Sequence, residues 1–135
     1  ELLAARKAVE VIYRDEMASF EGIKPPWIAP DVDEVHWMVY CVHLGTRFTA
    51  SARRQIVEDL AANFIEAAPY CKPLHQQFHY AQFGFRRGQF PLAERIGDRA
   101  LALPFHAHLD ADEIQFLVKT LKDSATNVGA GAAIY

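Results

Sequence analysis

The feature that most constrains the fold is the ten-residue run VHWMVYCVHL at residues 35–44. It is rich in β-branched and aromatic residues, and apolar side chains stand at both odd and even positions. A strand with apolar residues on both faces is typical of a strand buried in a sheet. Gly45 and Thr46 end the run, so we expect the strand to stop there.

The first twenty residues are predicted to form a long helix. Apolar or acidic residues recur at helical spacing along them: Leu2, Ala5, Val9, Ile12, Glu16 and Phe20. The pattern already runs at Glu1, with nothing before it to cap the helix, which indicates that the chain is part of a longer one. Gly22, Pro25 and Pro26 give a clear stop.

A second helix is predicted over roughly residues 51–67, ended by Pro69. Its inward positions would be Ile56, Leu60, Phe64 and Ile65, and its outward positions Arg53, Arg54, Glu58 and Asp59. Residues 92–99 favour a short helix interrupted by Gly97, and residues 100–105 a short strand.

The last helix has the strongest local signal. Asp110 and Glu113 form a capping box, and Leu109 with Ile114 forms a hydrophobic staple. Its core face would then be Ile114, Leu117, Val118 and Leu121. The small, Gly-rich residues 124–135 are expected to be a mobile tail or an extension, so the predicted domain is residues 1–123.

Together these elements predict a single α/β domain, a small two-layer sandwich of helices on a short, mostly antiparallel sheet. With 135 residues, the chain is long enough to bury about two-thirds of its unfolded surface. The net charge of −3 and the lack of a Lys/Arg stripe argue against nucleic acid as the main partner. No apolar stretch spans a bilayer, and Cys41 and Cys71 give no disulfide framework, so we expect no membrane and a cytoplasmic location.

Histidine is the first candidate for chemistry. Cys71, His75 and His79 are spaced by four, which is metal-ligand spacing on a helix. Pro73 lies between the first two and disfavours a continuous helix, so we predict no metal site.

No nucleophile elbow, phosphate-binding loop or dinucleotide fingerprint is present. Glu94, Asp98 and Glu113 are interpreted as solvated helix faces. The turn Arg86–Arg87–Gly88 fits two interpretations, a phosphate site with guanidinium forks and a free backbone N–H, or a plain surface turn. The segment between Tyr70 and Gln77, rich in polar residues among prolines, is of the kind that lines functional sites.

Read in order, these segments resemble the DegT/DnrJ/EryC1/StrS aminotransferases, especially their perosamine-synthase-like branch. The resemblance rests on the first helix with Arg6 and Tyr13–Arg14, VHWMVYCV at 35–42, PLHQQ at 73–77, GQFPLAERIGDRALALP at 88–104 and LDADEIQFLVKTL at 109–121. It covers nearly the whole chain, up to about residue 123.

The resemblance implies a dimeric, two-domain enzyme of the type-I aminotransferase fold, of which this chain is the C-terminal small domain. Pyridoxal phosphate would be held on a lysine of the large domain, which is absent from this chain. The substrate would be a nucleotide-linked 4-keto or 3-keto sugar, with glutamate as the amino donor. The chain alone would be inactive and bind no cofactor, because none of Lys7, Lys24, Lys72, Lys119 and Lys122 lies in the family's Schiff-base context.

In the family, the segment matching residues 70–77 approaches the cofactor and sugar. His75 would therefore contact sugar or phosphate, with Tyr70 and Lys72 beside it. The predicted substrate-binding set is Tyr70, Lys72, His75, Gln76 and Arg87. The chain departs from its relatives at residues 67–69 and at His43, where many relatives have arginine, and this leaves the sugar open.

Two other functions remain open. One is a free-standing, non-catalytic interaction domain that keeps the family's fold, and the other is a small metal-binding protein built on Cys71, His75 and His79. A domain separated from its partner should expose apolar surface along the first helix and residues 78–90, and should self-associate.

Overall fold

A four-stranded antiparallel sheet in the order β1-β2-β4-β3 forms one layer of the computed structural model, which describes residues 1–132. The strands are β1 (Ile23–Lys24), β2 (Tyr40–Leu44), β3 (Ala68–Pro69) and β4 (Ala100–Leu103). In the central pair, Tyr40 lies opposite Leu103, and Val42 lies opposite Leu101. Strands β3 and β4 are consecutive and paired, so residues 70–99 are the connection of one long hairpin.

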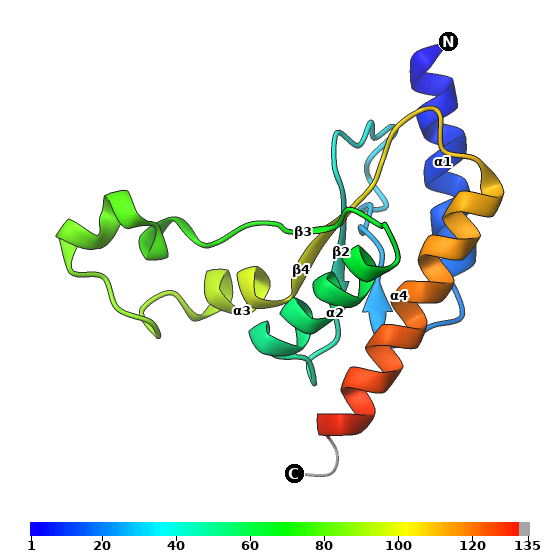
Figure 1. Cartoon of the computed structure of the whole chain (residues 1–135). Coiled ribbons are helices and arrows are strands. Elements are labelled where there is room, and N and C mark those ends of the chain that lie inside the picture. Colours follow the sequence, from blue (N-terminus) through cyan, green and yellow to red (C-terminus); the bar gives the residue numbers. More distant parts are fainter. Residues whose placement is uncertain (133–135) are drawn as a thin grey trace.

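Helices form the second layer (Figure 1). They are α1 (Leu2–Met17), α2 (Ala50–Ala62), α3 (Pro91–Arg99) and α4 (Ala111–Ala132). Helix α4 packs against both α1 and α2. The predicted α/β sandwich on a small antiparallel sheet is confirmed. Within residues 1–132, no helix combines the length and apolar character needed to cross a membrane.

Strand β2 alternates between one fully buried face and one half-buried face. Tyr40, Val42 and Leu44 point into the core, whereas Cys41 and His43 lie on the other face. The core therefore gathers on the side of the sheet that the helices cover. Burial raises the pKa of the Cys41 thiol, an effect that a backbone hydrogen bond from Leu101 reduces and nearby Cys71 increases.

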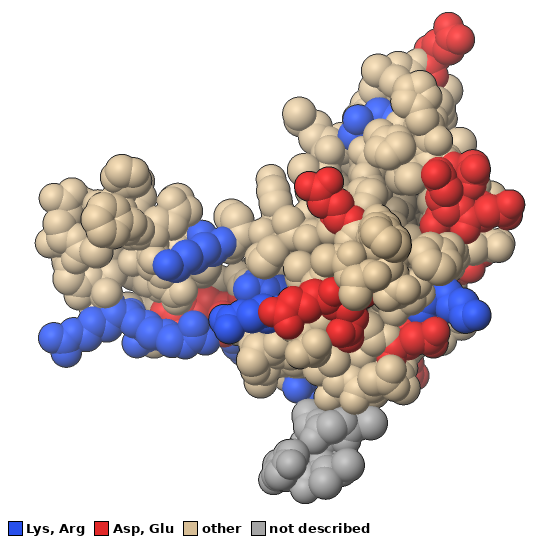
Figure 2. Space-filling model, in the orientation of Figure 1, with Lys and Arg blue, Asp and Glu red and all other residues tan. Residues whose placement is uncertain are grey.

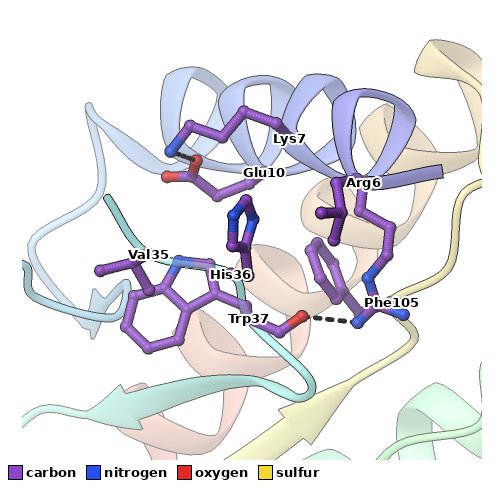
Figure 3. Close-up of a pocket in the computed structure, with 8 residues that line it drawn as sticks. Arg6, Lys7, Glu10, Val35, His36, Trp37 and Phe105 are labelled. Carbon is purple, nitrogen blue, oxygen red and sulfur yellow. Dashed lines mark hydrogen bonds and ion pairs between the residues drawn. The ribbon is translucent and has the colours of Figure 1, made fainter. Parts of the chain in front are cut away.

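The strand expected over residues 35–44 is half as long in the structure. Residues 35–39 cross α1 as an irregular segment, and their carbonyls bond to a side chain instead of a neighbouring strand. Arg6 Nη2 donates to Trp37 O at 2.5 Å and to Met38 O at 3.2 Å, while its guanidinium lies 4.9 Å from the Phe105 ring centre (Figure 3). The aromatic run therefore packs on a helix rather than extending the sheet.

The buried face of helix α1 overlaps the expected one but is rotated from it: the expected Val9, Ile12 and Phe20 do contact the core. Val9, Tyr13 and Met17 are buried, whereas Leu2 is exposed. The cause is Tyr13, whose ring stacks on Tyr40 with centres 4.7 Å apart and whose hydroxyl donates to a backbone carbonyl, that of Pro104, at 2.6 Å. An aromatic residue with a hydrogen-bonded hydroxyl thus sets the rotation of the helix.

Helix α2 ends five residues earlier than expected, in a Schellman motif. Ile65 N–H donates to Leu60 O and Phe64 N–H donates to Ala61 O, both at 3.0 Å. Ile65 and Leu60 are buried as expected, but Phe64 is wrong as an inward residue: it is 99 % exposed, with a left-handed φ of 61°. Glycine is the usual residue at this position of the motif.

Helix α4 starts as predicted and continues further than predicted. Its capping box is confirmed, since Glu113 N–H donates to Asp110 Oδ1 at 2.8 Å and Asp110 N–H donates to Glu113 Oε2 at 3.0 Å. The expected mobile tail is wrong for residues 124–132, which are helical, and Ala125 belongs to the core. Residues 133–135 lie outside the described residues.

Candidate functional site

The connection between β3 and α3 projects from the body of the molecule (Figure 1). We call residues 74–90 the aromatic lobe; it contains two short 3-10 helices, η1 (Leu74–Gln76) and η2 (Phe78–Phe83). Most of its large apolar side chains are exposed: Leu74, Phe78, Tyr80, Phe83, Phe85 and Phe90. The lobe therefore lacks a core of its own, and side chains of α3 hold it in place.

The main attachment is the carboxylate of Glu94 on α3. Its Oε1 lies 2.9 Å from His75 Nε2, and Gly88 N–H donates to both carboxylate oxygens at 2.8 Å. Phe90 N–H adds a longer bond of 3.4 Å. One carboxylate thus joins the outgoing limb of the lobe, through His75, to the returning limb, through Gly88 and Phe90. We call this arrangement the Glu94 clasp.

The environment of Glu94 favours its ionised form. Burial by itself raises the pKa of the carboxyl, but hydrogen bonds from Gly88 N–H, His75 and Phe90 N–H outweigh it, so the pKa lies below its usual value. The side chains of His75 and Glu94 are only 8 % and 7 % exposed. The pair is therefore a sheltered, charge-assisted contact rather than a surface ion pair.

Gly97 gives the second attachment, one turn after Glu94 on the same buried face of α3. A Cβ at this position would lie 2.7 Å from Pro73 Cδ and 3.1 Å from Cys71 O. Gly97 O also accepts a hydrogen bond from Arg53 Nη1 on α2. The expected interruption of the helix at Gly97 is wrong: α3 is continuous, and the glycine allows the chain before His75 to approach it closely.

His75 lines an apolar hollow in the lobe. The lining residues are Leu74, His75, Tyr80, Phe85, Phe90 and Ala93. The imidazole ring lies 4.7 Å from the Phe90 ring, which in turn meets Phe85 edge-on at 5.7 Å. The site therefore offers one polar ring among aromatic faces.

The other predicted substrate-binding residues are not all brought together. Tyr70 N–H extends the sheet by donating to Ala100 O at 3.3 Å, and Tyr70 does not line the hollow. Lys72 is exposed and contributes a carbonyl, which accepts from Gln77 Nε2 at 3.2 Å. Gln76 carries a buried amide nitrogen without a partner among residues 1–132.

Arg87 pairs with Asp98 on α3 through both carboxylate oxygens. The hydrogen bond from Arg87 and the charge of Asp98 raise the pKa of the guanidinium. The interpretation of Arg86–Arg87–Gly88 as a phosphate site with a free backbone N–H is wrong in one part, because Gly88 N–H is bonded to Glu94.

Sequence reasoning missed Glu94 and Tyr80. The interpretation of Glu94 and Asp98 as solvated carboxylates is wrong, since the first holds His75 and the second holds Arg87. A signal was present: Glu94 stands in the first turn of a helix that begins with Pro91, where the positive end of the helix favours a carboxylate.

Metal binding gains no support. Residues 71–79 form no continuous helix, so the four-residue spacing of Cys71, His75 and His79 does not place them on one face. Across the described part of the chain, no three His, Cys, Asp or Glu side chains are grouped as a metal ion requires. The crevice in Figure 3, between α1 and residues 35–37, measures about 10 Å³ and admits at most a single water molecule.

Charge is unevenly distributed between the lobe and the body. Residues 68–99, which include β3, the lobe and α3, contain five of the 14 Lys and Arg residues but only two of the 17 Asp and Glu residues. The lobe itself contains Arg86 and Arg87 and no acidic residue. Figure 2 shows Lys and Arg side chains along and below the lobe, and acidic side chains mainly over the half that contains α1, α2 and α4. The lobe therefore favours anionic ligands, although the whole chain is acidic.

Residues 1–122 match the model of the DegT/DnrJ/EryC1/StrS aminotransferase family. Among curated proteins, the GDP-perosamine synthase of Caulobacter vibrioides is 33 % identical over 90 % of this chain and 32 % of its own length. The dTDP-3-amino-3,4,6-trideoxy-alpha-D-glucose transaminase of Streptomyces venezuelae is 27 % identical over 91 % of this chain and 31 % of its own. The chain thus spans about a third of these relatives.

Solved structures agree with this match. A Streptococcus pneumoniae protein described as a sugar aminotransferase, in its PLP form, superposes with a TM-score of 0.84 at 25 % identity, over 94 % of this chain and 32 % of that one. The Helicobacter pylori aminotransferase involved in the biosynthesis of pseudoaminic acid gives a TM-score of 0.80 at 20 % identity, over 93 % and 32 %. The similarity to the Helicobacter pylori structure, at 20 % identity, shows a shared fold.

Proposed function

Since this chain belongs to the DegT/DnrJ/EryC1/StrS aminotransferase family, we propose that it forms the small domain of a pyridoxal-phosphate-dependent enzyme that transfers an amino group from glutamate to a nucleotide-linked keto sugar. In this proposal the aromatic lobe closes the substrate side of the active site. The Glu94 clasp carries the proposal, because it holds His75 in an aromatic hollow within residues 68–99, where basic residues outnumber acidic ones.

The chemistry of the lobe suits such a substrate. A nucleotide-linked sugar has an anionic diphosphate, a flat base and a ring with hydroxyl groups. Aromatic faces can stack against the base or the sugar, and arginine forks bind phosphate oxygens. Arg87 already has Asp98 as a partner, so in our proposal it approaches phosphate as one member of a basic surface rather than as a free cation.

The residues present do not form a site for pyridoxal phosphate by themselves. This cofactor is held through a lysine imine, and when bound it stabilises the negative charge that develops on the amino-bearing carbon. The hollow around His75 is lined by no lysine, and Lys122 Nζ donates instead to Glu16 O at 2.6 Å. We therefore assign no chemical step to this chain and place the cofactor in the large domain.

We further propose that this large domain covers the aromatic lobe and that the complete enzyme is a cytoplasmic homodimer. The exposed rings of Phe78 and Phe83 support a covered lobe, since contiguous apolar surface of this kind marks an interaction site. The same exposure supports the second candidate function, a non-catalytic interaction domain that uses the lobe to bind another protein.

The two candidates differ in what the complete reading frame encodes and does. We expect a lysine in the family's Schiff-base motif, an imine absorption band, and amino transfer from glutamate to a keto-sugar nucleotide. His75→Ala should then raise the KM for the sugar nucleotide at least tenfold while leaving the KM for glutamate unchanged. A purified complete protein that forms no imine with pyridoxal phosphate would exclude the enzyme and favour the interaction domain.

A further inference from the structure

We propose that Glu94 is a positioning residue that keeps a proton on His75 Nε2, so that His75 presents its other nitrogen, Nδ1, to the ligand. The ligand group that fits an unprotonated Nδ1 is a sugar hydroxyl, which donates to it. The identity of this group rests on the proposed function, whereas the role of Glu94 does not.

The first step is the direction of the bond between the two side chains. An ionised carboxylate has no proton and only accepts hydrogen bonds. Glu94 already accepts from Gly88 N–H through both oxygens, and these bonds help to keep its pKa low. The 2.9 Å contact with His75 therefore requires the proton to lie on Nε2. A neutral imidazole with Nε2 protonated has an unprotonated Nδ1.

The second step is that the ring is fixed in place. Only 8 % of the His75 side chain is exposed, and its ring packs against Phe90. The preceding Pro73 lies against Gly97, so the chain cannot approach α3 more closely there. A ring flip would break the bond to Glu94 and leave a sheltered carboxylate short of a donor, which is costly.

The third step is that Nδ1 is available. Among residues 1–132 it has no hydrogen-bond partner, and, unlike the amide nitrogen of Gln76, it is not one of the enclosed, unpaired polar atoms. His75 also lines the aromatic hollow, so a ligand seated there meets the imidazole. An unprotonated Nδ1 accepts from a hydroxyl and repels a phosphate oxygen, which has only lone pairs to offer.

The protonation of His75 can be observed directly in this chain. We would record long-range proton–nitrogen correlation spectra of the ring at pH 7.5, which distinguish a protonated from an unprotonated nitrogen. We expect Nε2 protonated and Nδ1 unprotonated. A neutral ring protonated at Nδ1 would overturn the role of Glu94 whatever the function of the protein.

Glu94→Gln is the informative variant, because the glutamine amide has nearly the same shape as the carboxylate. Its carbonyl oxygen accepts hydrogen bonds, but its NH2 group donates them. We expect the preference for the Nε2 proton to fall at least tenfold, toward a mixture of the two forms. Asp98→Asn, one turn further along α3, is the matched control and should leave His75 unchanged. Equal spectra for wild type and Glu94→Gln would overturn the proposal; where Glu94→Gln fails to fold, the wild-type spectrum decides.

The ligand group is tested separately on the complete protein with labelled histidine, because in our proposal the substrate site is complete only with the large domain. GDP-mannose and GDP are the probes. We expect GDP-mannose to shift the Nδ1 resonance of His75 and GDP to leave it unchanged. An equal shift with both would overturn the assignment to a sugar hydroxyl and indicate a phosphate contact. No shift with either, while Nε2 remains protonated, would count against the proposed function and leave the role of Glu94 intact.

Discussion

The helical body and the aromatic lobe keep their shapes in different ways. In the body, α1, α2 and α4 bury a continuous set of apolar side chains against β2 and β4. Tyr13 both stacks on Tyr40 and donates a hydrogen bond to Pro104 O. In the lobe the apolar side chains face outward, and a few polar contacts to α3 set its position. The body is therefore stabilised by burial, which is spread over many residues, and the lobe by a small number of specific bonds.

The largest effect is expected from Tyr13→Ala in the body. The substitution removes a fully buried ring, its stack on Tyr40 and its hydrogen bond to Pro104 O. We expect the free energy of unfolding to fall by about 3–5 kcal/mol, measured by urea denaturation. Phe78→Ala is the control in the lobe, where the ring is 89 % exposed, and it should change stability little. If the two variants lost equal free energy of unfolding, burial of apolar side chains would stabilise the lobe as much as the body, and the comparison would be wrong.

Gly97→Ala should affect the lobe more than the body. The new methyl group would lie within 2.8 Å of the Pro73 ring, so we expect an overpacking cost of about 1–3 kcal/mol and displacement of His75. Amide resonances of residues 72–90 should shift while those of β2 remain. Gly129→Ala is the matched control: its methyl group meets Arg47 no closer than 3.6 Å, so it should be neutral or stabilising.

Phe64→Gly should stabilise the body by about 1 kcal/mol. A left-handed conformation costs a non-glycine residue roughly 1–2 kcal/mol, and the exposed ring of Phe64 contributes no packing that the change would remove. Thermal unfolding should therefore occur at a higher temperature. Phe64→Ala keeps the strain and serves as the control. A lower melting temperature for Phe64→Gly would mean that the ring has a stabilising contact.

The smallest global effect is expected from acid, which should loosen the lobe before the body. The folded pKa of Glu94 lies below its ordinary value of 4.5, so the clasp stabilises the lobe fully above that pH and less as pH falls through the lower, folded value. The protection factor of Gly88 N–H against hydrogen exchange should fall over this acid range, while the protection factors in β4 stay high. If Gly88 N–H instead lost its protection as the pH was raised, the expected direction of the pH dependence would be contradicted.

Sequence patterns predicted the body better than the lobe, for physical reasons. The capping box at Asp110 and the burial of Ile56 and Leu60 depend on near neighbours in the chain, so local spacing was enough. Phe64 was placed inward because helical spacing continued through it, although the helix ends two residues earlier. The spacing of apolar residues does not indicate where a helix will end in a residue with a left-handed backbone conformation.

The site needed information that local patterns do not contain. His75 was singled out from the segment and the family resemblance, but its partner Glu94 is 19 residues away. A carboxylate on a short helix normally faces solvent, and only the return of the chain at Gly88 reveals what it binds. The roles of all five residues in substrate binding remain predictions: Tyr70, Lys72, His75, Gln76 and Arg87.

The pairing of β3 with β4 has a consequence for the evolution of such a domain. Because these strands are consecutive partners, everything from residue 70 to residue 99 is an insertion within one hairpin, and the pairing of β2 with β4 does not depend on it. Insertions, deletions and substitutions there leave the strand order untouched. The same scaffold can therefore carry lobes of different length and chemistry, and specificity can diversify while the fold stays the same.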